Sequence, residues 1–124
     1  HSAVRLIKSV DHAAVSSFWQ PPNGAELENC CEGLKQVINL NKLSSVHAFH
    51  WWPEFKDRHP LSVGVERWKK YLALVHEHEQ KTGDSERYVC LEFVKDDEPK
   101  NLANDAQTLH QMLAEIEHEY EVAE

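Results

Sequence analysis

The chain has 124 residues, with 13 basic and 21 acidic side chains and a formal net charge of −8. This length predicts a single domain, and the acidic balance argues against nucleic acid as a partner, because duplex binding needs clustered basic residues. No run of about 20 apolar residues is present that could cross a membrane, so no membrane partner is expected. Three cysteines, none in a C-x-x-C pair, fit a reducing compartment, and a cytoplasmic protein is expected.

Apolar runs and amphipathic segments alternate along the chain. Residues 5–10 resemble the end of a helix, as if the chain began within a larger fold. Strands are then predicted at 14–19, 45–51 and 88–94, and each is followed by a helix, at 25–40, 65–75 and 102–116, whose apolar residues recur every three or four positions. The acidic tail, 115–124, is expected to fray.

The βαβαβα order predicts an α/β fold with a parallel sheet. The strand at 88–94 is nearly continuous in apolar residues, which is typical of strands covered on both faces. Strands of this kind would expose their edges unless further strands joined them. The sequence therefore predicts part of a larger sheet.

Glu92 is a carboxylate within an otherwise apolar strand. Side chains alternate along a strand, so Val89, Leu91 and Phe93 share one face while Cys90 and Glu92 share the other. A carboxylate in this setting is costly unless it is paired, protonated or bound to a metal. Glu92 is thus the first functional candidate, and the alternative is a buried salt bridge.

Two histidines of the predicted strand 45–51 point to opposite faces. Whichever of His47 and His50 shares the side of Glu92 could coordinate a divalent cation through a neutral imidazole. The alternative is an ordinary packed core histidine.

The segment after that strand is a long loop rich in aromatic and charged residues, of the kind that carries binding sites. Arg58 could hold a carboxylate, a phosphate or a pair of hydroxyls, and Asp57 or His59 could be a metal ligand or orient one. The alternative is an Asp57–Arg58 ion pair that fixes the loop. Trp51 could stack on a sugar ring or simply fill the rim.

Four motifs carry a resemblance to a known family. They are Trp19-Gln20-Pro21, Val46-His47-Ala48-Phe49-His50-Trp51, Arg58-x-Pro60-Leu61-x-x-Gly64-x-x-x-Trp68 and Leu91-Glu92-Phe93-Val94-x-Asp96-Asp97. Together they resemble the C-terminal part of the sugar phosphate isomerase/epimerase family, the xylose-isomerase-like TIM barrels. The resemblance covers residues 10–112. It implies that the three strands are the sixth, seventh and eighth of a (β/α)8 barrel, and that residues 1–124 form one partial domain without its N-terminal half.

The resemblance also implies metal-assisted isomerisation or epimerisation of a small sugar or sugar phosphate. His47 and Glu92 would hold a divalent cation (Mn, Mg, Co or Zn), and Glu92 would move the proton. Gln20 stands where the family has a sixth-strand aspartate, and the family's fifth-strand glutamate would lie before residue 1. The expected substrate-binding residues are Gln20, His50, Trp51, Asp57, Arg58 and His59.

Two other functions remain open. Three strands cannot close an eight-stranded barrel, so the chain could be a binding or structural module, completed by a homo-oligomer or by another chain. The run Asp57-Arg58-His59, followed by Gly64, also resembles the Asp-Arg-His loop of endonuclease IV, a zinc-dependent relative that cuts DNA at abasic sites. Against it, Trp19-Gln20-Pro21-Pro22 replaces the expected sixth-strand Asp and His, and the charge of −8 opposes duplex binding.

Overall fold

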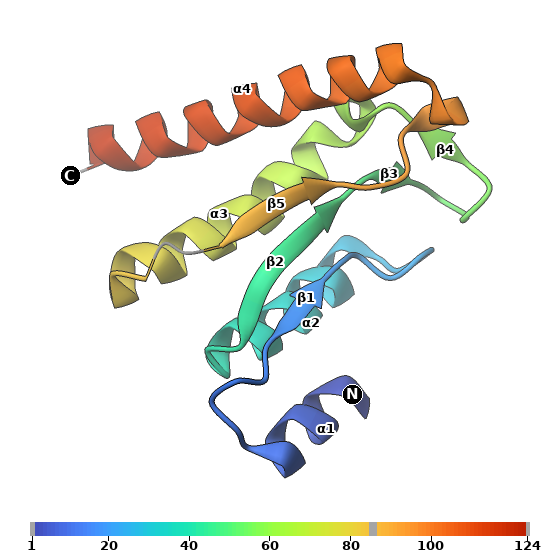
Figure 1. The fold of residues 1–124 in the computed structure, drawn as a ribbon. Coiled ribbons are helices and arrows are strands. Elements are labelled where there is room, and N and C mark those ends of the chain that lie inside the picture. The colour runs from blue at the N-terminus through green and yellow to red at the C-terminus, as the bar shows by residue number, and fades with distance from the viewer. Residues whose placement is uncertain (1, 85–86, 124) are drawn as a thin grey trace.

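The computed structural model describes residues 2–84 and 87–123. Figure 1 shows a short parallel sheet backed by helices. In chain order the elements are α1 (Ser2–Val10), β1 (Ser17–Trp19), α2 (Leu27–Asn39), β2 (Leu43–Ala48), β3 (His50–Trp51), β4 (Arg58–His59), the 3-10 helix η1 (Leu61–Gly64), α3 (Val65–Thr82), β5 (Tyr88–Leu91), the 3-10 turn η2 (Lys95–Asp97) and α4 (Pro99–Ala123).

The main sheet confirms the predicted α/β fold with parallel strands. Its order is β1-β2-β5, and β2 pairs in parallel with both neighbours. The strands are thus neighbours in the order in which the chain forms them, with α2 between the first two and α3 between the last two. Among the described residues, β1 and β5 each have one edge without a strand partner.

One face of this sheet packs on helices α2, α3 and α4 (Figure 1). Trp19, Val46 and Ala48 lie on that face and are buried, together with apolar side chains of the helices. The opposite face is uncovered among the described residues, since Phe18 and Tyr88 are exposed on it. Within the described residues, the strands are therefore covered on one face.

The strands end earlier than the sequence predicts. The predicted strand 45–51 is β2, which stops at Ala48, followed by a separate strand β3 that pairs antiparallel with β4. The break falls at Phe49, whose carbonyl oxygen accepts a hydrogen bond from Trp68 Nε1 at 2.8 Å. Similarly, β5 stops at Leu91, and Phe93 adopts the left-handed conformation with φ of 56°.

The predicted helices form, and α4 differs in two respects. Its buried residues are Asp105, Leu109, Met112 and Ile116, whereas Leu102, the first apolar residue of the predicted helix 102–116, is exposed. In the described part of the predicted tail, 115–123, the chain is helical as far as Ala123, and residue 124 lies outside the described residues. An ion pair between Lys69 of α3 and Glu115 links the two helices near the start of this acidic segment.

The described helices include none that has both the length and the apolar content to cross a membrane.

Candidate functional site

The predicted site residues gather at the carboxyl edge of the sheet. Parallel strands end at the same edge, which is where α/β proteins place their binding residues. Gln20 follows β1, the β3–β4 hairpin follows β2, and Glu92 follows β5. The backbone N–H of Glu92 donates to the carbonyl oxygen of Ala48 at 3.1 Å, so the ladder extends one residue beyond β5.

His47 and Glu92 meet on the uncovered face. His47 is the register partner of Cys90, and Glu92 lies two residues further along the same side of the chain. His47 Nδ1 lies 2.7 Å from Glu92 Oε2, and the side chains are 25% and 32% exposed. Since both are accessible to solvent, the pair is not the buried salt bridge considered as the alternative.

Phe18 holds the imidazole of His47 from the other side. The two rings are stacked, with centroids 4.4 Å apart and planes inclined by 10°. Stacking restricts rotation of the imidazole and so favours the orientation in which Nδ1 faces Glu92. Phe18 was missed from the sequence because the contact joins neighbouring strands, and the only signal was an aromatic residue on the face opposite Trp19.

Replacing Phe18 with Leu is expected to loosen the His47 ring. An aromatic pair contributes about 1 kcal/mol, so a small loss of stability is expected, together with mixed imidazole tautomers in place of one Nδ1–H form. Nitrogen NMR of the ring would measure the tautomers. Phe55→Leu, which changes an exposed loop residue, is the matched control. Identical His47 spectra in wild type and Phe18→Leu would contradict the positioning role.

His47 and Glu92 supply two donor atoms of the types that bind divalent cations. Nδ1 and Oε2 lie 2.7 Å apart, which is a hydrogen-bond distance, whereas donors about 2.1 Å from a tetrahedral cation lie about 3.4 Å apart. The described residues contain no cluster of three or more His, Cys, Asp or Glu side chains able to hold a metal, while catalytic zinc sites commonly use three protein ligands. The pair could thus supply two ligands of a metal site once its hydrogen bond opens.

Trp51 and Arg58 form one side of the hairpin at this edge. They are register partners across β3 and β4, and the Arg58 guanidinium lies 4.3 Å from the centroid of the Trp51 ring. Trp51 Nε1 donates to the carbonyl oxygen of Phe93 at 3.4 Å, which ties the hairpin to the segment after β5. Arg58 Nη1 lies 3.8 Å from Asp97 Oδ2. The acidic partner of Arg58 is therefore Asp97, and not Asp57 as in the alternative interpretation of the loop.

Asp57 shapes the hairpin loop. Its Oδ2 accepts the backbone N–H of Glu54 at 3.2 Å, and its own N–H donates to the carbonyl oxygen of Glu54 at 2.9 Å. This reciprocal pair closes the turn before β4. Asp57 is therefore used in the local backbone structure, away from the His47–Glu92 pair.

His50 lies inside the fold. It is 8% exposed, its register partner is His59, and their ring centroids are 6.0 Å apart. Gly64 lies directly against the imidazole, since a Cβ at that position would come within 2.5 Å of His50 Cγ. The substrate contact predicted for His50 thus falls on a packed side chain, and His47 is the histidine that shares the side of Glu92.

Burial lowers the pKa of His50, and the nearby His59 and Arg67 lower it further. Near pH 6.5 the imidazole of His50 therefore binds a proton in the unfolded chain but not yet in the folded chain. The free energy of unfolding is expected to fall as the pH drops through about 6.5. His78, whose pKa is also lowered by burial, adds to the same slope. Urea titrations at several values between about pH 7.5 and 6 would measure it.

The variant His50→Asn should show a flatter pH dependence than wild type, because one of the two depressed imidazoles is removed. His110→Asn, on the exposed side of α4, is the control and should keep the wild-type slope. An unchanged slope in His50→Asn would show that His50 does not carry the effect.

Asp105 is a buried carboxylate that the sequence analysis missed. It is 4% exposed, and its Oδ1 accepts the backbone N–H of Leu61, the first residue of η1, at 3.0 Å. Burial raises its pKa, and this hydrogen bond acts in the opposite direction. Its position four residues before Leu109, on the buried side of α4, was the available signal.

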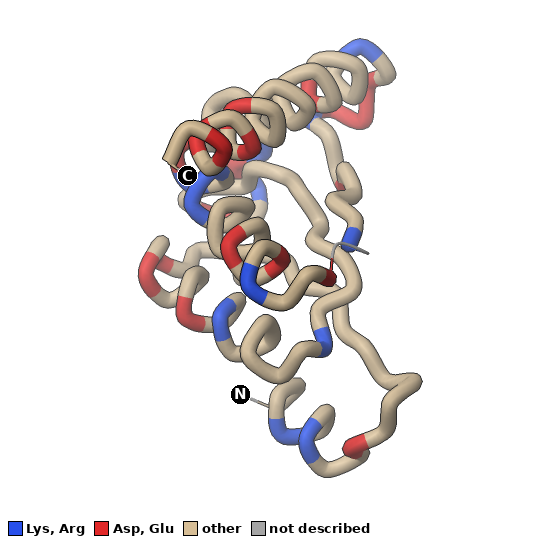
Figure 2. The backbone as a smooth tube through the Cα atoms, turned by 90° about the vertical axis from the view of Figure 1, so that its left-hand side faces the viewer, with Lys and Arg blue, Asp and Glu red and all other residues tan. Residues whose placement is uncertain are grey.

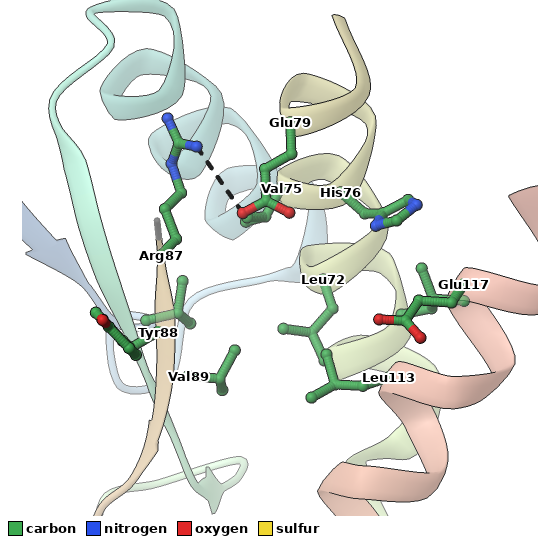
Figure 3. Close-up of a pocket in the computed structure, with 11 residues that line it drawn as sticks. Leu72, Val75, His76, Glu79, Arg87, Tyr88, Val89, Leu113 and Glu117 are labelled. Carbon is green, nitrogen blue, oxygen red and sulfur yellow. Dashed lines mark ion pairs between the residues drawn. The ribbon is translucent and has the colours of Figure 1, made fainter. Parts of the chain in front are cut away.

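A separate cavity of about 160 Å³ lies between β5, α3 and α4, at the start of β5 (Figure 3). Its walls are mostly aliphatic, and Arg87 lies at one end, 3.8 Å from Glu79 and 95% buried. Burial raises the pKa of Glu79, and Arg87 opposes that shift. None of the predicted site residues lines this cavity, which lies at the opposite end of β5 from Glu92.

Comparisons of the chain with protein-family models, with curated proteins and with solved structures found no match.

Proposed function

We propose that the chain carries part of the active site of a metal-assisted isomerase or epimerase that acts on a small sugar or sugar derivative. The observation that supports this proposal is the His47–Glu92 pair, with 2.7 Å between Nδ1 and Oε2 at the carboxyl edge of adjacent parallel strands. These are the two residues that the family resemblance assigns to the cation. Their types and their positions at strand ends suit that chemistry.

We also propose that the three strands of the main sheet are strands six to eight of a (β/α)8 barrel. Three features support it. The parallel strands are adjacent in chain order, helices pack on one face only, and the outer edges of β1 and β5 have no partner among the described residues. In a barrel the uncovered face, with Phe18 and His47, would line the interior.

In the proposed reaction Glu92 transfers the proton. For isomerisation, its carboxylate takes a proton from the carbon beside the substrate carbonyl and returns it to the former carbonyl carbon, while the hydroxyl proton moves to the former carbonyl oxygen, so the net composition is unchanged. Epimerisation would need a second acid on the opposite face of the carbon, the role that the resemblance gives to the family's fifth-strand glutamate. His47 and Glu92 would hold the cation, which when bound polarises the carbonyl group. Gln20, Trp51 and Arg58, from the same edge, would orient the hydroxyl groups.

Isotope exchange in D₂O tests this function directly. The protein, supplied with Mn²⁺, Co²⁺, Mg²⁺ or Zn²⁺, is incubated with a panel of aldoses, ketoses and their phosphates, and NMR follows deuterium at the carbon beside the carbonyl. Exchange that requires both protein and cation is the expected result. Absence of exchange with every member of the panel would overturn the proposal.

The open edges of the sheet favour a second candidate, a non-catalytic module completed by another copy or another chain. Edge strands present unpaired N–H and C=O groups that another strand can bind. Sedimentation would then show self-association or a stable partner, and substitutions at Glu92 would leave that association unchanged. The exchange experiment separates the two candidates, because a module of this kind produces no deuterium incorporation.

A further inference from the structure

The charges in the loops at the carboxyl edge indicate whether a phosphorylated substrate could bind there. TIM barrels that bind a phosphate commonly hold it with the loops after the seventh and eighth strands and with the N-terminus of a short extra helix. In the proposed barrel these are residues 49–64, which include η1, and residues 92–98, which include η2. A phosphate site here would need free backbone N–H groups or basic side chains without acidic partners.

The first amide of η1 is already bound to a carboxylate of the protein. Leu61 N–H donates to Asp105 Oδ1 at 3.0 Å, and Asp105 is buried and fixed on α4. The hydrogen bond of this amide is therefore already made within the protein. A phosphate could use the amide only by displacing the buried Asp105 carboxyl group.

Two basic side chains of the hairpin loop also lie close to carboxylates. Lys56 Nζ lies 3.0 Å from Glu54 Oε2, and Arg58 Nη1 lies 3.8 Å from Asp97 Oδ2. A phosphate would compete with these carboxylates for the same donors. Each pair offsets one positive charge of the loop, which lowers its attraction for a dianion.

Two further basic residues near this edge are also engaged. Arg67 lies over the Trp52 ring, 4.1 Å from its centroid, and donates to the carbonyl oxygen of Ala25 at 2.8 Å. Lys100, in the first turn of α4, lies 2.7 Å from Glu98. Both positive charges are thus directed to groups of the protein.

The turn between β5 and α4 adds negative charge. Residues 95–98 consist of one lysine followed by three carboxylates, and Asp96 and Asp97 are exposed. Figure 2 shows acidic positions gathered where the chain enters α4. A dianionic ester would be repelled by this turn, whereas an uncharged sugar would not.

Apolar ring surface is available beside the same turn. The Trp51 and Phe93 rings lie 5.1 Å apart, and Phe93 is 47% exposed. Aromatic faces of this kind suit the C–H side of a sugar ring. On these grounds we infer that the substrate is a neutral polyhydroxylated carbonyl compound and not its phosphate ester, an inference that rests on the proposed isomerase function.

The test compares each free ketose with its own phosphate ester in the D₂O exchange assay. D-fructose is paired with D-fructose 6-phosphate, and D-xylulose with D-xylulose 5-phosphate, with Mn²⁺ in excess of the ester. We expect kcat/KM to be at least about tenfold higher for the free sugar in at least one pair, as repulsion from several nearby carboxylates predicts. Equal or higher values for the esters would overturn this inference and leave the isomerase function standing. No exchange with any compound would overturn both.

Asp96→Asn tests the electrostatic reason. Asp96 has φ of 58°, a conformation that Asn adopts readily, so the turn should keep its shape. The substitution should raise kcat/KM for a phosphate ester about threefold and leave the value for the free sugar unchanged. Glu117→Gln removes the same charge from the exposed side of α4 and should change neither value. An ester value in Asp96→Asn equal to that of wild type would overturn the role assigned to the acidic turn.

Discussion

Glu92→Gln is expected to lower the rate of deuterium exchange by at least about a hundredfold, because a positioned acid/base group commonly contributes between about 10² and 10⁴ in rate. The amide of Gln can still contact His47 but cannot accept the substrate proton at this step. NMR in D₂O with saturating Mn²⁺ would measure the loss. Exchange at the wild-type rate in Glu92→Gln would contradict the role of the carboxylate.

Stability measurements show whether that loss is chemical. Glu92 is 32% exposed, so removing its charge should change the free energy of unfolding by less than about 1 kcal/mol. Glu119→Gln, on the exposed side of α4, is the matched control and should keep wild-type activity and stability. A large drop in the stability of Glu92→Gln would instead assign Glu92 a structural role.

Gly64→Ala is expected to destabilise the fold by about 1–3 kcal/mol, which is typical of overpacking a buried position. Gly64 has φ of −102°, which any residue can adopt, so the cost is steric. The added Cβ would lie 2.5 Å from Cγ and 2.8 Å from Cε1 of the buried His50 ring. Urea unfolding would measure the loss.

Gly33→Ala is the matched control in helix α2. The nearest heavy atom to a Cβ there is Trp19 Nε1 at 3.8 Å, an ordinary contact, so alanine should stabilise the helix by about 0.5–1 kcal/mol. In the double variant Gly64→Ala/His50→Ala, the smaller side chain removes the clash, and the combined loss should be less than the sum of the single losses. Additive losses would show that His50 is not the group that Gly64 accommodates.

The local sequence pattern was sufficient for the α/β class with parallel strands and for Glu92 as a member of the central pair. Period-two alternation placed Cys90 and Glu92 on one face, and the βα alternation indicated parallel strands, which together bring Glu92 to the histidine of the neighbouring strand. The structure places His47 there. The pattern could not choose between His47 and His50, because that choice depends on the register between β2 and β5.

Contacts between distant segments decided the rest. The hydrogen bond from Trp68 to Phe49, 19 residues earlier, interrupts the predicted strand, and the chain then turns His50 beneath Gly64. The bond between Asp105 and Leu61 spans 44 residues and gives a polar residue a place in the buried face of α4. The spacing of residues within one segment carries no information on partners so far along the chain. Neither the break at Phe49 nor the buried position of Asp105 could therefore be predicted.

The alternation of side chains across β2 also separates two kinds of mutational constraint. Val46 and Ala48, on the helix-facing side, are each 1% exposed, and a change of volume there disturbs the core. His47, between them, projects from the opposite face and is 25% exposed. New side chains at position 47, and at position 92 beyond β5, can therefore be introduced without repacking the core between the sheet and its helices. The carboxyl edge thus offers a scaffold on which different ligand sets can be exchanged at little structural cost.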